Sequence, residues 1–209
     1  MTFSFKAFLP ALALMMGLAA PVAAQEATPE PATPPALTYM AIGPADAKVT
    51  IVEYASFTCP HCAQFHAEVF KDLKKDYIDT GRVRFEFREV YFDRYGLWAS
   101  MMARCGGAVR FFGITDILYT TQQEWAATDD PAAVVESLKR IGRTAGMEDA
   151  ALNACMNDGA MAEALVAQYQ ENSTKDAVEG TPTLFINGEK HSNMTYADLK
   201  AIIDPLLTQ

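Results

Sequence analysis

The 209-residue chain has only four cysteines, far too few to hold a small domain together by disulfides, so a hydrophobic core must supply most of its stability. Half of the residues are apolar, which is enough for such a core. The chain also lacks a concentrated basic patch, since no Lys/Arg cluster is longer than Lys74-Lys75. Nucleic-acid phosphates require such a patch, so we expect no nucleic-acid partner.

No apolar run reaches the about 20 residues that a membrane-spanning helix needs. The run at residues 7–18 is shorter than a membrane anchor. It follows a positive Lys6 and precedes the small residues 22–24, which is the pattern of a secretory signal peptide. We predict a signal peptide over residues 1–24, cleaved after Ala24, and therefore export to an oxidising compartment. Cleavage removes one basic residue and no acidic one, so the net charge changes from −9 to −10.

The remaining chain reads as alternating extended and helical segments. Residues 25–38 contain four prolines and are predicted to form a disordered linker. Residues 49–55 are strand-like, a helical period of apolar residues then continues to about Asp76, and residues 82–88 alternate between polar and apolar. This order predicts a βαβ unit.

The second half of the chain is mostly helical before β-like residues return. Residues 93–175 are rich in helix-forming residues, and Asp129-Asp130-Pro131 is a helix-start signal within them. Residues 181–186 are strand-like, and the following Asn187-Gly188 is typical of a β-hairpin turn. An amphipathic helix with Thr195 as its cap closes the chain.

The candidate site is Cys59-Pro60-His61-Cys62, which lies between the first strand and its helix. The first N–H groups of a helix lack partners and carry partial positive charge, so they stabilise a thiolate on Cys59. The spacing of three residues brings Cys62 back beside Cys59, close enough for a disulfide that opens and closes without moving the fold. Pro60 is compatible with the first turn, where its missing N–H has no cost.

These features together resemble the thioredoxin superfamily and, within it, the DsbA family of secreted dithiol oxidases. The resemblance rests on Cys-Pro-His-Cys, the preceding Ser56-Phe57-Thr58, the downstream Thr181-Pro182, the helical insertion and the signal peptide. It implies an α/β thioredoxin-like fold, a mixed central sheet flanked by helices, with an inserted all-helical subdomain. The thioredoxin-like domain would span residues 39–92 and 176–209, and the insertion residues 93–175.

The resemblance also implies roles for single residues. Cys59 would be the exposed nucleophile and Cys62 the resolving cysteine. Pro182 would be a cis-proline facing the disulfide, and Thr181 would hydrogen-bond a bound substrate strand. Glu53, six residues before Cys59, matches the family's buried acid, which carries protons to and from Cys62 and has a raised pKa. The alternative for Glu53 is an ordinary carboxylate at a strand end.

The three histidines are expected to have different roles. The imidazole of His61 could lie near the Cys59 sulfur and lower its pKa, which would make the disulfide a strong oxidant. His66 is expected to be a partly exposed helix residue and His191 a hairpin residue. A zinc site is not expected, because no second pair of ligands has suitable spacing.

Cys105 and Cys155 are both in the helical segment, 50 residues apart. Some members of the DsbA family carry an extra disulfide in this region, and export favours a Cys105–Cys155 bond. The alternative is two reduced cysteines that act as small hydrophobic residues.

The implied activity is that of a monomeric periplasmic dithiol oxidase. It would donate the Cys59–Cys62 disulfide to unfolded exported proteins through a mixed disulfide, without a further cofactor. A membrane quinone-linked partner would reoxidise it. A disulfide isomerase or a pathway-specific reductant on the same fold is the enzymatic alternative, and a chaperone-like binder of unfolded chains is the alternative from another class.

Overall fold

The computed structural model describes residues 1–2 and 37–208. The signal peptide, its cleavage site after Ala24 and most of the predicted linker at residues 25–38 lie outside the described residues. Five strands occur in the described part: β1 (Met40–Ile42), β2 (Val49–Ala55), β3 (Val83–Glu89), β4 (Thr183–Ile186) and β5 (Glu189–Ser192).

These strands form one mixed sheet in the order β1-β3-β2-β4-β5. The pair β2 and β3 is parallel, and the other three pairs are antiparallel. The predicted hairpin is confirmed: Asn187 and Gly188 have φ values of 47° and 87° and connect β4 to β5. The sheet places β2 at its centre, so the residues of this strand have neighbours on both sides.

The helix after β2 is continuous from Pro60 to Ile78. It consists of α1 (Pro60–Phe65), η1 (His66–Phe70), α2 (Lys71–Leu73) and η2 (Lys74–Ile78), of which the two η segments have wider π-helical turns. After β3 come α3 (Arg94–Cys105), α4 (Gly107–Thr120), α5 (Gln122–Trp125), α6 (Pro131–Thr144), α7 (Asp149–Met156) and α8 (Gly159–Lys175). The last helix is α9 (Tyr196–Thr208).

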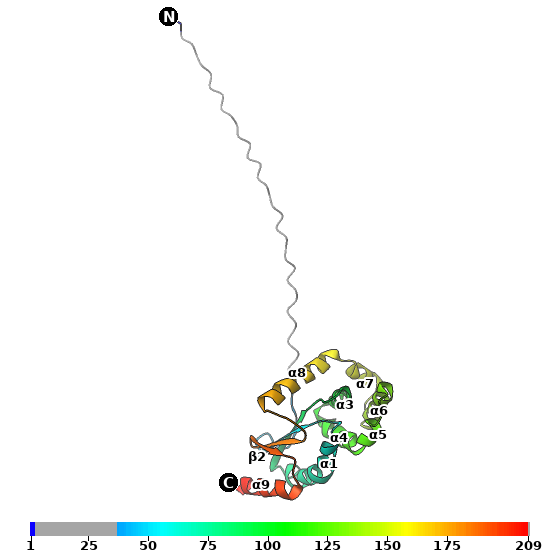
Figure 1. The fold of residues 1–209 in the computed structure, drawn as a ribbon, viewed down its shortest axis with the longest axis vertical. Helices are drawn as coiled ribbons and strands as arrows, with labels where there is room; N and C mark the ends of the chain where they lie inside the picture. The colour runs from blue at the N-terminus through cyan, green and yellow to red at the C-terminus, as the bar shows by residue number, and fades with distance from the viewer. Residues whose placement is uncertain (3–36, 209) are drawn as a thin grey trace. The chain divides into compact units, whose positions relative to one another are not determined.

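Helices α3 to α8 occupy the chain between β3 and β4, and we call them the helical block. In Figure 1, α3 to α7 lie together on one side of the sheet, while α9 lies near α1. This arrangement confirms the expected thioredoxin-like fold class with a helical insertion. The exact boundaries at residues 93 and 175 stay a prediction. None of the helices in residues 37–208 has both the length and the apolar character of a membrane span.

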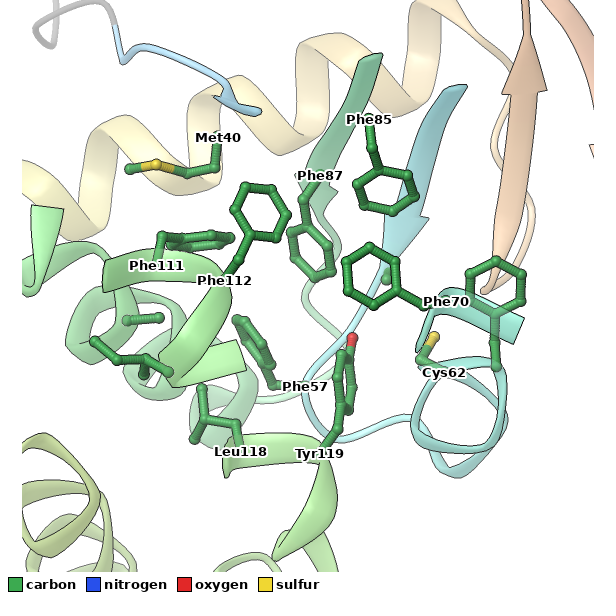
Figure 2. Close-up of a cluster of buried hydrophobic side chains, with 14 of the residues drawn as sticks. Met40, Phe57, Cys62, Phe70, Phe85, Phe87, Phe111, Phe112, Leu118 and Tyr119 are labelled. Carbon is green, nitrogen blue, oxygen red and sulfur yellow. The ribbon is translucent and has the colours of Figure 1, made fainter. Parts of the chain in front are cut away.

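An aromatic cluster joins the sheet to the helical block (Figure 2). Phe57, from the turn after β2, stacks on Phe87 of β3 with ring centroids 5.4 Å apart. Phe111 of α4 packs edge-on against both rings. All three side chains are almost fully buried, and burial of this size contributes roughly 1.5–3 kcal/mol for each large apolar side chain. The turn that carries the cysteines is therefore packed against the helical block.

Arg104 and Cys105, at the end of α3, connect this helix to other parts of the fold. Arg104 makes a two-pronged ion pair with Glu89 at the end of β3, with N–O distances of 2.5 and 2.8 Å, and both side chains are at most 5% exposed. Arg104 also donates to the carbonyl of Thr38. The structure joins Cys105 and Cys155 in a disulfide with a Cα–Cα distance of 5.9 Å, which connects the end of α3 to α7.

Candidate active site

The turn between β2 and α1 places Cys59 at the N-cap of α1. Cys59 has an extended backbone conformation, Pro60 occupies the first helical position, and the carbonyl of Cys59 accepts from Ala63 N at 3.2 Å. The Cys62 side chain makes the largest contribution to lowering the pKa of the Cys59 thiol, and the backbone N–H groups of Cys62 and His61 at the helix start add smaller ones. The local sequence therefore produces the arrangement that its helix-start pattern predicts.

The two sulfurs have different environments. Cys59 retains 8% of its surface and Cys62 none, so Cys59 is the more accessible of two largely buried residues rather than a fully exposed one. The Cys62 thiol donates a hydrogen bond to Cys59 and, with smaller contributions from other donors, lowers the pKa of Cys59 to about 5. Burial raises the pKa of Cys62 far above its usual value. At neutral pH the reduced pair therefore holds one thiolate, on Cys59, and one thiol, on Cys62.

The residue pair Thr181-Pro182 faces the cysteines from the segment before β4. The peptide bond between them is cis, and the Thr181 carbonyl lies 3.5 Å from the Cys59 sulfur. The Thr181 hydroxyl is buried and, among the described residues, has no hydrogen-bond partner. Thr181 is thus in contact with the sulfur that a substrate would attack.

Glu53 lies in β2, where its neighbours across the sheet are Phe87 and Leu184. The side chain is buried, and its Oε1 atom has no hydrogen-bond partner within the described residues. Burial, with a smaller contribution from a negative charge on Cys59, raises the pKa of Glu53 to about 8. Its own charge in turn raises the pKa of Cys62. Glu53 is therefore protonated at neutral pH and is electrostatically linked to both cysteines.

The three histidines do not all lie where the sequence predicts. His61 has an exposed side chain and acts on Cys59 through its backbone N–H, so a role for its imidazole stays a prediction. The expectation for His66 is wrong: it is buried, bonds Asp116 at 2.9 Å and stacks on Phe70. Burial lowers the pKa of His66 despite this carboxylate. His191 lies in the hairpin strand β5, as expected.

Three residues that follow β3 in the sequence hydrogen-bond the active-site turn. The sequence did not predict these contacts. Gln122 donates to the carbonyls of Phe57 and Cys59, Tyr119 donates to Ser56 O, and Asp93 accepts from the Thr58 hydroxyl at 2.7 Å. Tyr119 lies in the same aromatic cluster as Cys62 (Figure 2). They lie 35 to 65 residues from their partners in sequence, so no local spacing signals these contacts.

A cavity of about 390 Å³ opens beside the helix that carries the cysteines. One wall is formed by α1 and η1, including Phe65 and Val69. The other is formed by residues 193–195, which connect β5 to α9, and by Tyr196, the first residue of α9. Glu68 and Gln64 give one wall a polar strip and hydrogen-bond each other. The described residues contain no group of three or more His, Cys, Asp or Glu side chains placed to hold a metal ion.

Comparisons with known proteins agree with this geometry. The model of a family described as Thioredoxin matches residues 36–205. A Rickettsia bellii protein, named as a candidate protein-disulfide oxidoreductase, is 33% identical over 171 residues, which cover 81% of this chain and 65% of that protein. The chain spans only 60% and 62% of two other Rickettsia relatives.

Two further relatives have names that refer to disulfide chemistry. Disulfide bond formation protein D of Bacillus subtilis is 25% identical, over 78% of this chain and 74% of that protein. The crystal structure of Wolbachia pipientis alpha-DsbA1 superposes with a TM-score of 0.77 at 27% identity and covers 83% of this chain and 93% of that one.

Proposed function

Because the chain belongs to the thioredoxin superfamily, and within it to the DsbA family, we propose that it is a thiol:disulfide oxidoreductase that oxidises dithiols in other proteins. The observation that carries this proposal is the contrast between the two sulfurs, with the pKa of Cys59 lowered to about 5 and that of Cys62 raised. A stabilised Cys59 thiolate stabilises the reduced form. The Cys59–Cys62 disulfide is then a strong oxidant.

The reaction would begin when a substrate thiolate attacks the Cys59 sulfur of the disulfide. A bond forms between the substrate sulfur and Cys59, the Cys59–Cys62 bond breaks, and Cys62 leaves as a thiolate. Glu53 is protonated at neutral pH and would give its proton to Cys62, whose pKa is raised. The accessible sulfur thus enters the mixed disulfide while the buried one is neutralised.

A second substrate thiolate would then attack the substrate sulfur of the mixed disulfide. The substrate gains its own disulfide, the bond to Cys59 breaks, and the two electrons remain on the enzyme as a Cys59 thiolate and a Cys62 thiol. The lowered pKa of Cys59 makes it a good leaving group in this step. The Thr181 carbonyl, which lies beside the Cys59 sulfur, would position the substrate backbone.

The proposal also covers the cellular location of the protein, its oligomeric state and its partners. We propose that the chain is exported to the periplasm after cleavage behind Ala24 and works there as a monomer on newly exported, unfolded proteins. Part of each substrate would lie in the cavity beside α1. A membrane quinone-linked oxidase would restore the disulfide.

The experiment is oxidation of a reduced dithiol peptide by the oxidised protein. The wild type is expected to transfer one disulfide per molecule and Cys59→Ser to transfer none. Cys62→Ser, mixed instead with the disulfide form of the peptide, should accumulate mixed disulfides, because its Cys59 thiolate opens the peptide disulfide and no Cys62 resolves the product. A Cys105→Ala/Cys155→Ala double variant is the control and should retain the activity. Full activity in Cys59→Ser would refute the assignment, and transfer of electrons to a disulfide peptide instead would favour the reductant.

A further inference from the structure

Gln122, the first residue of α5, connects the helical block to the nucleophile. Its side chain is 4% exposed. The amide nitrogen donates to the carbonyl of Phe57 at 2.8 Å and to the carbonyl of Cys59 at 3.0 Å. Both hydrogens of a buried amide are therefore used on two backbone oxygens of the active-site turn, 63 and 65 residues away in sequence.

The two carbonyls belong to the peptide groups that join Phe57 to Thr58 and Cys59 to Pro60, so the amide fixes the peptide group directly after the nucleophile and the one that precedes Thr58. The Cys59 carbonyl also accepts from Ala63 N, which directs it along the helix. With this carbonyl held, the N–H groups of His61 and Cys62 stay directed at the Cys59 sulfur. A rotation of the Cys59 peptide would move the sulfur away from these donors.

The amide also acts through its charge distribution. The partial negative charge of a carbonyl next to a thiolate disfavours the thiolate, and a hydrogen-bond donor on the carbonyl oxygen reduces this effect. In the buried turn the local dielectric is low, so such a dipole has more influence than it would in water. Orientation and charge thus act in the same direction, toward a stable thiolate.

We propose that Gln122 is a positioning residue for the nucleophile, through which the helical block controls how strongly oxidising the Cys59–Cys62 disulfide is. The inference deepens the proposed dithiol oxidase function and rests on it. Gln122 makes no contact with substrate in this account and acts only through the backbone of the turn. A purely structural role would instead have it satisfy two carbonyls and contribute to stability alone.

The variant Gln122→Met separates the two roles, because it keeps the length of the side chain and removes both donors. Thr115→Val is the matched control: Thr115 is 2% exposed and donates one side-chain hydrogen bond to Phe111 O at 2.9 Å, within α4. Both variants are expected to unfold at a lower urea concentration than the wild type. Only Gln122→Met is expected to change the redox properties.

The readouts are the pH titration of the thiolate by absorbance at 240 nm and the equilibrium constant with glutathione. Gln122→Met is expected to raise the Cys59 pKa by about one unit, which makes the disulfide about tenfold less oxidising at pH 7. Thr115→Val should keep the wild-type values. Gln122→Asn retains the amide on a shorter stem and should fall between them; it carries the test if Gln122→Met does not fold.

Wild-type pKa and glutathione values in both Gln122 variants would overturn the proposal, as would an equal shift in Thr115→Val. These results are independent of peptide oxidation by the wild-type protein. If the wild type fails to oxidise peptides while the Gln122 variants shift the pKa, the proposed oxidase function fails and the positioning role stands. If the wild type oxidises peptides and the variants do not shift, the reverse holds.

Discussion

Replacing Glu53 by glutamine should change how the stability of the protein depends on pH. Burial raises the pKa of this carboxyl from 4.5 to about 8, so the folded protein holds a proton that the unfolded chain has released. Between these two values the folded state binds more protons than the unfolded state. The wild type therefore loses stability as the pH rises from about 4.5 to 8.

At about 1.4 kcal/mol per pKa unit, the loss approaches roughly 5 kcal/mol above pH 8. Glu53→Gln carries no ionisable group and should escape this loss. Below pH 4.5 the two proteins should have similar stabilities, and by pH 9 the variant should be more stable by several kcal/mol. The gain should be smaller in the oxidised protein, because the Cys59 thiolate that contributes to the raised pKa is then absent.

The assay is urea unfolding of the reduced and oxidised proteins at one-unit intervals from pH 4 to 9. Titrations shared by the wild type and variant cancel in the difference between their unfolding free energies, which leaves chiefly Glu53. Glu171→Gln makes the same chemical change at an exposed position on α8 and should show no such trend. Parallel stability curves for the wild type and Glu53→Gln would refute the reasoning that Glu53 is buried and protonated.

Three further expectations concern other parts of the molecule. Alkylation of the reduced protein at Cys59 should follow the thiolate, with a midpoint near pH 5; a midpoint above pH 8 would contradict the lowered pKa. Cys105→Ala/Cys155→Ala should lower the unfolding free energy by about 2–4 kcal/mol without changing the glutathione equilibrium of the active-site pair, as urea and redox titrations would measure. Arg104→Met should cost about 3–5 kcal/mol because it leaves Glu89 charged and buried, and adding Glu89→Met should restore most of it; an equally unstable double variant would exclude this explanation.

Much of the fold could be read from the sequence because its signals are local. The alternation in residues 82–88 corresponds to β3, whose side chains alternate between buried and partly exposed. Asp130 caps α6 with Pro131 at its first position, and Asn187-Gly188 forms the hairpin turn. Strand β1 was not predicted. It is three residues long and is defined by its pairing with β3 rather than by a pattern of its own.

The cysteines, Glu53 and Thr181-Pro182 could be predicted from the sequence, whereas the residues after β3 that contact the active-site turn could not. The helix-start pattern predicted the positions of Cys59 and Cys62. Glu53 lies in the strand predicted just before them. Gln122 and Asp93, in contrast, contact the turn only because the helical block folds onto the sheet. His66 illustrates the same limit, since its burial depends on α4, which carries its partner Asp116 some 50 residues away.

The measurement that tests the central claim most directly is equilibration of the purified protein with defined ratios of reduced and oxidised glutathione. The fraction of the Cys59–Cys62 pair that is oxidised gives its reduction potential. If Cys59 is held as a thiolate and Cys62 as a thiol, the potential should lie near about −120 mV, the value typical of a DsbA-type oxidant. A potential near about −270 mV, typical of thioredoxin, would contradict the account, as would a pair that does not exchange with glutathione.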